Sequence, residues 1–368
     1  MLLCHPLVKI LVSAIFESWR HPTYPSQKED SLIAESTQLV NDGRSLDREQ
    51  MTQVVDSIMK GECSDKQIES LLVALYEKGE TVEELAGAAS AMRKHMTPIQ
   101  TRRENVVDTC GTGGGKSGTF NISTAAAIVA AAAGASVAKH GNRASTSKTG
   151  SADVLVELGV NIECSVETVQ KSLDQLGLCF CFAPLFHPSV KHVMKVRRRL
   201  AHPTIFNLLG PLCNPANAPF QVLGAGREET RIKLAEALSL LGTKRSIVVH
   251  SRDGLGEVSI SDKTEVSEVH GKNVTEGILA PEDFGCETGN LTMLAATSPA
   301  ESAEKIQRVL AGHSGPARDV VVANAAAALW VSGLCDGLLT GAERCSNAID
   351  NGQAAEILKE LADLTNRG

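Results

Sequence analysis

Apolar residues recur at helical spacing in residues 45–97, most clearly in the stripe of Ile68, Leu71, Leu72 and Leu75. Two capping boxes mark helix starts, because in each a hydroxyl and the side chain three residues later can satisfy free first-turn amides. They are Ser64 with Gln67 and Thr81 with Glu84. The pattern predicts three helices here, the third ending at Thr97-Pro98.

From residue 106 onward, short apolar runs alternate with glycine-rich loops and alanine-rich helices. This alternation is typical of βαβ units and predicts a largely parallel sheet. The expected strands are residues 106–107, 136–138, 179–182, 221–224 and 246–249. A helical stretch at residues 189–200 interrupts the series, and we expect it to pack on the N-terminal helices.

The predicted fold class is α/β: a large domain with a mostly parallel sheet flanked by helices, plus a small all-helical domain. We expect residues 1–35 to form an extension and linker, with a polar linker at 21–30. The small domain would comprise residues 36–104 with 186–204 returning to it, and the large catalytic domain residues 105–185 and 205–368. The apolar segment 7–16 is too short to span a bilayer and is interrupted by Lys9, so no membrane association is expected.

Composition narrows the function further. Of the 368 residues 43% are hydrophobic but only 3% aromatic, so the core is built mainly from Ala, Val, Leu and Ile. The formal charge of −7 disfavours nucleic acid as a partner, because sequence-independent binding needs a basic field. The ten cysteines lack zinc-site spacing and are expected to be reduced thiols of a cytoplasmic protein.

Candidate chemistry is concentrated in the glycine-rich turn at residues 107–124, VDTCGTGGGKSGTFNIST. Its glycines let backbone amides approach an anion, and the helix that follows directs its positive end to the same place. An ordinary tight turn would also use glycines. A Walker A loop is excluded because that pattern needs glycine where Cys110 stands.

A second cluster follows the strand expected at 136–138. Residues 139–147 read KHGNRASTS, with Lys148 and Ser151 beyond. Cations and hydroxyls at the end of a parallel strand are a plausible anion cradle, although a solvated surface turn has a similar composition.

From about residue 36 to the C-terminus the chain resembles the anthranilate phosphoribosyltransferases. The resemblance rests on three strings in the family's order: the glycine turn ending in NIST at 121–124, KHGNR at 139–143, and TIFNLLGP at 204–211. It implies transfer of the phosphoribosyl group of phosphoribosyl pyrophosphate (PRPP) to the amine of anthranilate, with Mg²⁺ as cofactor, on the tryptophan pathway. It also implies a homodimer.

The resemblance further implies roles for individual residues. PRPP would be held by Gly111, Gly114, Gly115, Thr119, Asn121, Ile122, Ser123, Thr124, Lys139, His140, Gly141, Asn142, Arg143, Ala144, Ser145, Thr146, Ser147 and Ser151. Anthranilate would contact Gly111, Asn142, Arg197, His140, His187 and Pro211, and Mg²⁺ would bind Ser123 and Glu257. No covalent nucleophile is expected.

Two of these assignments have alternatives. The planar guanidinium of Arg197 can pair with a carboxylate through two parallel hydrogen bonds, but an arginine beside Arg198 and Arg199 is also an ordinary helix-surface charge. His187 is as consistent with a structural role as with a substrate contact.

Three positions depart from the family pattern. Gly115 stands where GTGGD has aspartate, Gly256 stands where DGLDE has aspartate, and Pro203 often corresponds to arginine. The first two affect the diphosphate and metal side, with Asp253 a possible but displaced substitute. The two missing aspartates leave open a degenerate family member that acts as a binding protein. A second alternative is a pyrimidine nucleoside phosphorylase, which shares the general fold and also binds an oxyanion on a glycine turn.

Overall fold

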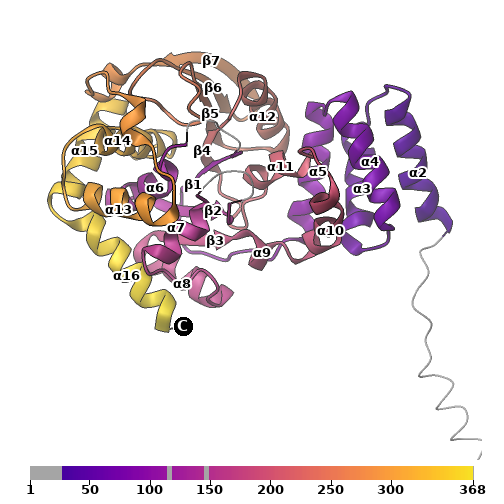
Figure 1. The fold of residues 1–368 in the computed structure, drawn as a ribbon, viewed down its shortest axis with the longest axis horizontal. Coiled ribbons are helices and arrows are strands. Elements are labelled where there is room, and N and C mark those ends of the chain that lie inside the picture. The colour runs from indigo at the N-terminus through magenta and orange to yellow at the C-terminus, as the bar shows by residue number, and fades with distance from the viewer. Residues whose placement is uncertain (1–26, 114–117, 145–148, 368) are drawn as a thin grey trace, which may run out of the picture.

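The N-terminal part of the protein is a bundle of helices. In the computed structural model, residues 27–113, 118–144 and 149–367 are described, and the bundle contains α2 (Gln27–Asn41), α3 (Arg48–Lys60), α4 (Asp65–Lys78) and α5 (Val82–His95) (Figure 1). The three predicted helices are confirmed, as are the capping boxes that start α4 and α5. An unpredicted capping box, Asp47 with Gln50, starts α3.

Helix α2 differs from the expected arrangement. The polar linker predicted at 21–30 overlaps its first turn, and the boundary predicted at 35/36 falls inside it. Ile33 and Val40 are each 1% exposed and pack into the helical core, which is what holds this polar segment as a helix. The apolar segment 7–16 lies outside the described residues.

The C-terminal part is built on a seven-stranded sheet with the order β3-β2-β1-β4-β5-β6-β7. The first five of these strands are parallel, and β6 and β7 are antiparallel. The five predicted strands are confirmed, whereas β6 and β7 were not predicted. The bounds are β1 Val106–Gly111, β2 Ser136–Gly141, β3 Leu178–Phe182, β4 Phe220–Gly224, β5 Arg245–Ser251, β6 Thr264–His270 and β7 Asn273–Leu279.

Helices cover both faces of the sheet, and successive residues on a strand point to opposite faces. Val222 and Val249 pack on one face with six helices: α6 (Ile122–Ala132), α7 (Ser151–Glu157), α13 (Pro299–Leu310), α14 (Pro316–Val331), α15 (Leu338–Asp350) and α16 (Gln353–Arg367). Their neighbours Leu223 and Val248 pack on the other face with α12 (Glu228–Leu241) and the helical bundle. α8 (Val166–Leu176) covers β3, and none of the described helices is long and apolar enough to cross a membrane.

Short elements join the two parts: α9 (Ala183–Phe186), α10 (Lys191–Arg199), α11 (Phe206–Leu209) and 3₁₀ turns at Pro188–Val190 and Gly210–Leu212. Two further 3₁₀ turns, Pro281–Phe284 and Leu291–Leu294, lie between β7 and α13 and pack on α14. α10 packs on α3 and α4, as expected for residues 189–200. Side chains also cross between the parts: Lys233 donates to the carbonyl of Glu80 at 3.0 Å, and Arg93 donates to that of Leu212 at 2.7 Å.

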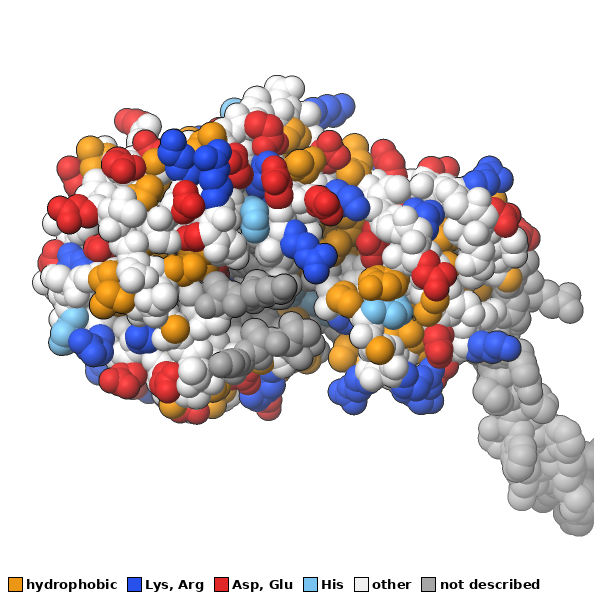
Figure 2. Space-filling model, turned by 45° about the horizontal axis from the view of Figure 1, so that its top comes forward, with side chains coloured by type: hydrophobic (Ala, Val, Ile, Leu, Met, Phe, Trp, Pro, Cys, Tyr) orange, Lys and Arg blue, Asp and Glu red, His pale blue; other side chains and the backbone are white. Residues whose placement is uncertain are grey.

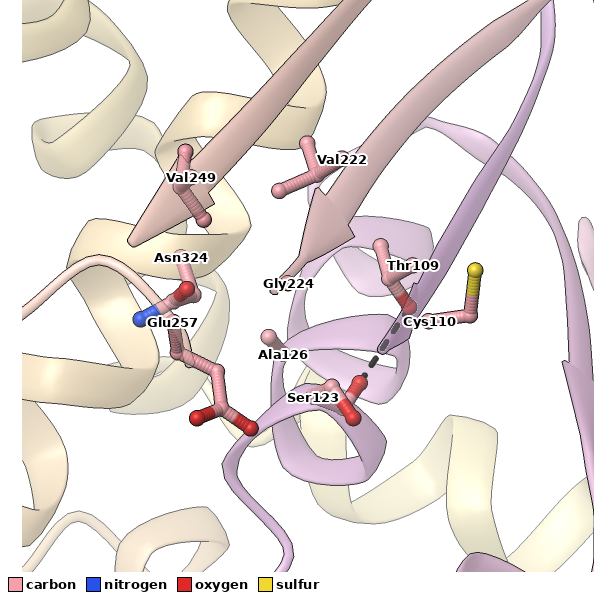
Figure 3. Close-up of a pocket in the computed structure, with 9 residues that line it drawn as sticks. All are labelled: Thr109, Cys110, Ser123, Ala126, Val222, Gly224, Val249, Glu257 and Asn324. Atoms are coloured by element: carbon pink, nitrogen blue, oxygen red, sulfur yellow. Dashed lines mark hydrogen bonds between the residues drawn. The ribbon is translucent and has the colours of Figure 1, made fainter. Parts of the chain in front are cut away.

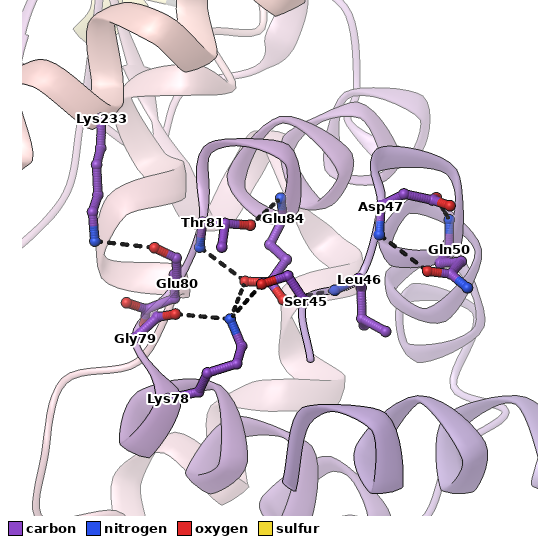
Figure 4. A network of polar contacts seen from close by, with 10 residues as sticks. All are labelled: Ser45, Leu46, Asp47, Gln50, Lys78, Gly79, Glu80, Thr81, Glu84 and Lys233. Carbon is purple, nitrogen blue, oxygen red and sulfur yellow. Dashed lines mark hydrogen bonds and ion pairs between the residues drawn. The ribbon is translucent and has the colours of Figure 1, made fainter. Parts of the chain in front are cut away.

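A buried carboxylate fixes the bundle end that faces α12 (Figure 4). Glu84 is 0% exposed and accepts hydrogen bonds from the backbone N of Leu46 at 3.0 Å and of Thr81 at 2.8 Å. Lys78 pairs with it at 3.0 Å. Because a buried charge is costly unless it is paired and hydrogen-bonded, this network specifies how α4, α5 and the preceding loop meet.

Candidate active site

A cavity of about 520 Å³ opens at the carboxyl ends of β1, β2 and β4. Ligands bind at this edge in open α/β sheets, because the loops that follow parallel strands converge there. It is lined from one end by the glycine turn and the start of α6, from the side by the loop after β2, and from the other end by α10 and α11.

The floor of the cavity depends on a close approach of glycines. A Cβ on Gly224 would lie 1.8 Å from the carbonyl oxygen of Gly256, so only glycine allows the 254–257 loop to rest on β4. Gly224 in turn accepts a hydrogen bond from the backbone N of Thr112 at 2.9 Å. The glycine turn and the loop carrying Glu257 are thereby held on the same strand end.

Two side chains that carry oxygen atoms, Ser123 and Glu257, and one lysine, Lys139, lie at this floor. Ser123 and Glu257 both line the cavity, and Figure 3 shows their side chains reaching a smaller adjoining pocket from α6 and from the loop after β5. Lys139 is 3% exposed and donates to the hydroxyl of Ser123 at 3.1 Å and to the carbonyl of Thr109. Burial lowers the pKa of Lys139. The negative charges nearby oppose that effect, most strongly Asp108 and least strongly Glu257.

Glu257 is held in an unusual electrostatic state. Burial raises its pKa to about 7, Lys139 opposes the rise and Asp253 adds to it. The adjacent backbone is fixed by Asn324 of α14, whose side chain accepts from the N of Val258 at 3.1 Å and donates to its carbonyl at 2.9 Å. The carboxyl group therefore has a defined position beside the cavity.

Asp253 does not replace the missing aspartate. One of its oxygens accepts from the N of Leu255 at 3.0 Å and the other from the hydroxyls of Ser259, at 2.5 Å, and Ser261. Burial raises its pKa, but these hydrogen bonds outweigh that effect and leave the pKa lowered. Asp253 does not line the cavity, and its role in the structure is to close the loop.

The KHGNR loop is anchored chiefly by Asp153, and Glu163 also pairs with its Arg143 at 3.5 Å. Asp153 of α7 accepts from the N of Ala144 at 2.9 Å and of Gly150 at 3.2 Å, and it pairs with Arg143 at 3.1 Å. Asn142 lines the cavity next to this anchor. The loop therefore presents polar groups at the strand end, as its composition predicts for an anion cradle.

The opposite end of the cavity carries Arg197 of α10. It is half-buried, its guanidinium lies 5.7 Å from the ring centre of Phe206, and it donates to Oδ1 of Asn207 at 3.4 Å. Burial lowers its pKa, yet an arginine keeps its charge. Among the described residues no carboxylate pairs with it, which leaves its planar donors available to a bound anion.

One neutral histidine, His140, lines the cavity, and a second, His187, lies beside it in the core. Nδ1 of His140 donates to the carbonyl of Gly210 at 2.9 Å, so its Nε2 is an acceptor, and that atom is buried without a partner among the described residues. Burial lowers the pKa of His140 to about 3 and that of His187 to about 4. The rings are 5.0 Å apart, but only His140 lines the cavity.

Most of the predicted site residues are brought together here. Fourteen of the predicted site residues line the cavity: Gly111, Thr119, Asn121, Ser123, Lys139, His140, Gly141, Asn142, Arg143, Ala144, Ser151, Arg197, Pro211 and Glu257. Ile122, Thr124 and His187 do not line it and are buried in the core around it. Gly114, Gly115, Ser145, Thr146 and Ser147 lie outside the described residues.

Sequence reasoning missed several lining residues. Phe206 and Asn207 belong to the TIFNLLGP string, which was used only to identify the resemblance. Gly224 ends a predicted strand and Gly226 follows it, and this glycine pair at a strand end was the available signal. On the face shown in Figure 2, acidic and basic side chains are interspersed around the hollow between the two parts.

Comparisons with known proteins agree with this arrangement. A family model for the α/β domain of the glycosyl transferase family matches residues 103–355, and one for the helical bundle domain of that family matches residues 35–96. An anthranilate phosphoribosyltransferase of Rhodopirellula baltica is 50% identical over 321 residues, covering 87% of this chain and 94% of the relative. One of Thioalkalivibrio sulfidiphilus is 47% identical over 320 residues, covering 87% and 95%.

Solved structures show the same similarity. The crystal structure of anthranilate phosphoribosyltransferase from Thermus thermophilus matches with a TM-score of 0.84 at 39% identity, covering 90% of this chain and 99% of that one. The Saccharomyces cerevisiae enzyme, in complex with PRPP and Mg, matches with a TM-score of 0.84 at 28% identity, covering 92% and 99%.

Proposed function

The chain belongs to the anthranilate phosphoribosyltransferase family, and we propose that the cavity described above binds both substrates of that reaction, anthranilate beside Arg197 and PRPP beside the glycine turn. The enzyme transfers the phosphoribosyl group of PRPP to the amine of anthranilate in tryptophan biosynthesis. The observation that carries the proposed placement is a single cavity with an arginine unpaired by any described carboxylate at one end and a helix N-terminus at the other.

Anthranilate fits the Arg197 end for chemical reasons. Its carboxylate can accept two parallel hydrogen bonds from the guanidinium, and the ring of Phe206 offers an apolar surface beside it. The aromatic amine is largely unprotonated at neutral pH, so little general-base power is needed. The side chain of His140 also lines the cavity, and its Nε2 is a buried acceptor without a partner among the described residues.

PRPP fits the glycine-turn end, where Thr119, Asn121 and Arg143 line the cavity. Backbone amides at the start of α6 and the helix dipole favour its pyrophosphate, and the loop anchored by Asp153 supplies further donors. Held in this way, the two substrates face one another, and most of the rate enhancement would come from alignment.

Mg²⁺ suits the donor set at the cavity floor. Ser123 and Glu257 offer a hydroxyl and a carboxylate, hard oxygen ligands that this cation prefers, and Mg²⁺ usually completes its shell with water and substrate phosphates. Bound there, it would neutralise charge on the departing pyrophosphate. The described residues contain no cluster of three or more potential His, Cys, Asp or Glu ligands, so most of the shell would come from PRPP and water.

The Gly256→Asp variant is expected to need several-fold less Mg²⁺ for half-maximal rate, because it restores a carboxylate beside Glu257. The new Cβ would lie 3.3 Å from the carbonyl oxygen of Ala225, so the loop must shift only slightly. Initial rates measured against Mg²⁺ concentration provide the test. The Gly256→Ala variant is the steric control, and an equal change in both variants would contradict the added-ligand explanation.

The Mg²⁺ requirement is also expected to depend on pH. Since the pKa of Glu257 is raised to about 7, the carboxyl group is mostly neutral at pH 6 and mostly ionised at pH 8. Only the ionised form is a good ligand, so half-saturating Mg²⁺ should rise about tenfold from pH 8 to pH 6. A half-saturating Mg²⁺ concentration that stays constant over this range would show that protons and Mg²⁺ do not compete for the Glu257 carboxylate.

Broader features of the protein follow as proposals. We propose a division into two domains. The helical domain comprises residues 36–104 with 186–204 and is extended by the start of α2, and the α/β domain comprises residues 105–185 and 205–368. A homodimer through the helical domain is supported by Tyr76 on α4, an aromatic side chain of a type enriched at interfaces, which stays 47% exposed although its ring stacks on that of His202. A cytoplasmic location is supported by the nine described cysteines, all of which are free thiols.

The phosphorylase alternative makes a different prediction for the same cavity. A pyrimidine nucleoside phosphorylase would cleave thymidine or uridine with inorganic phosphate. We expect no release of thymine or uracil in this assay at enzyme concentrations that consume anthranilate. Phosphorolysis at a rate comparable with anthranilate consumption would contradict the proposed substrates.

A further inference from the structure

Helix α6 begins at an asparagine whose side chain does not cap it. Asn121 occupies the N-cap position, yet its side chain makes no hydrogen bond to the first-turn amides. An N-cap asparagine commonly accepts a hydrogen bond from the second or third amide of its helix. Among the described residues, the backbone N–H of Ser123 at the second position finds no acceptor. Something therefore holds the Asn121 side chain away from the helix it precedes.

Ser302, in the first turn of α13, provides that restraint. Its hydroxyl accepts a hydrogen bond from the backbone N of Asn121 at 2.9 Å and donates one to Oδ1 of the same residue at 2.9 Å. Ser302 is 0% exposed and is not part of the cavity wall, whereas Asn121 is. The contact joins positions 181 residues apart in the sequence.

The direction of these hydrogen bonds determines which amide atom faces the substrate. A hydroxyl has one hydrogen, and here it goes to Oδ1, so Nδ2 occupies the other branch of the amide. Among the described residues Nδ2 has no acceptor. A donor on a cavity-lining side chain, beside a helix N-terminus that its own side chain leaves uncapped, is suited to an anion.

We propose that Ser302 is a positioning residue that turns the Asn121 side chain away from α6, so that Nδ2 of Asn121 and the N–H of Ser123 can donate to an anionic phosphate oxygen of PRPP. This inference rests on the proposed placement of PRPP at the glycine-turn end of the cavity. Without Ser302, the Asn121 side chain is free to rotate and cap α6, which removes both donors from the cavity.

Apart from the N–H of Asn121 itself, which Ser302 accepts, the surrounding backbone is held by contacts that do not involve Ser302. Phe120 donates from its backbone N to the carbonyl of Leu294 at 2.8 Å, and Ala296 donates to that of Gly118 at 2.9 Å. Loss of the Ser302 hydroxyl should therefore release the Asn121 side chain rather than the loop that carries it. The expected consequence is weaker substrate binding in a folded enzyme.

The test is PRPP binding by titration calorimetry in the full-length Ser302→Ala enzyme, with Mg²⁺ present. We expect the Kd for PRPP to rise about tenfold, the effect of losing a hydrogen bond to a charged group, and the KM for anthranilate to stay within about twofold. Ser302→Thr, which keeps the hydroxyl, should restore PRPP affinity. Ser298→Ala is the matched control, because Ser298 caps the same helix through Glu301 without touching Asn121.

A double-mutant cycle separates positioning from a general structural role. If Ser302 acts through Asn121, adding Ser302→Ala to Asn121→Ala should cause no further loss of PRPP affinity. An unchanged Kd in Ser302→Ala, an equal loss in the Asn121→Ala background, or an equal loss in Ser298→Ala would overturn the inference. Failure of the wild-type enzyme to bind PRPP would instead contradict the proposed function.

A second variant decides the matter if Ser302→Ala does not fold. Asn121→Asp keeps an oxygen to accept from Ser302 but replaces the Nδ2 donor with a negatively charged oxygen facing the phosphate. We expect a folded protein whose PRPP affinity falls more than that of Ser302→Ala is predicted to fall, about tenfold. PRPP affinity equal to wild type in this variant would overturn the inference.

Discussion

The Glu257→Ala enzyme is expected to lose turnover by a factor on the order of 10²–10³ while its PRPP and anthranilate sites stay intact. Glu257 is the only acidic residue among the described residues that line the cavity. Charge that develops on the departing pyrophosphate must be neutralised, and an alanine leaves Ser123 as the sole proposed protein ligand for Mg²⁺. The measurement is initial rate against Mg²⁺ concentration at saturating substrates.

Two controls show whether the loss belongs to the carboxylate. Glu257→Gln keeps the size and polarity of the side chain but not its charge, so it should lose nearly as much activity as the alanine variant. Asp262→Ala removes an exposed carboxylate that only accepts from the N of Lys263 at 2.7 Å, and it should behave as wild type. Wild-type turnover in Glu257→Ala would contradict the assignment of Glu257 as a Mg²⁺ ligand.

The Arg197→Ala enzyme is expected to show a KM for anthranilate about 10- to 100-fold higher than wild type, with the KM for PRPP within about twofold. Loss of hydrogen bonds to a charged group costs about 1.5–3 kcal/mol, and each 1.4 kcal/mol is a factor of ten. Arg197 is the charged residue at the end of the cavity opposite the glycine turn, which is why the effect should be confined to one substrate. Steady-state kinetics with each substrate varied in turn give both constants.

Neighbouring arginines provide the comparison. Arg198 is exposed on the same helix and does not line the cavity, so Arg198→Ala should leave both constants unchanged. Arg197→Lys keeps the charge but loses the two-donor geometry, and we expect an intermediate KM for anthranilate. An equal rise in both constants for Arg197→Ala would contradict its assignment to anthranilate.

Local patterns in the sequence were sufficient for much of the fold. The capping boxes at Ser64 and Thr81 and the apolar runs of β1 to β5 are each encoded within a few residues, and the structure contains them. Helix α2 was missed because its sequence is mostly polar and its few apolar residues, such as Ile33, become informative only when packed. Strand β7 was missed because most of its residues are exposed.

The candidate site divides in the same way. The glycine turn, the KHGNR loop and Arg197 could be proposed from composition, spacing and resemblance. Contacts between distant segments could not, because a sequence does not show which loops meet. Asn324 fixes the backbone beside Glu257 from α14, and Ser302 holds Asn121 from α13. Neither residue carries a local signal that points to the substrate cavity.

The most direct test of the central claim is the loss of anthranilate fluorescence when the purified protein is mixed with anthranilate, PRPP and Mg²⁺. We expect steady consumption of anthranilate that requires all three components, that stops when Mg²⁺ is removed with a chelator, and that resumes when Mg²⁺ is restored. Folded protein that binds PRPP yet consumes no anthranilate at any Mg²⁺ concentration would contradict the account, and a non-catalytic binding protein would then be the better description.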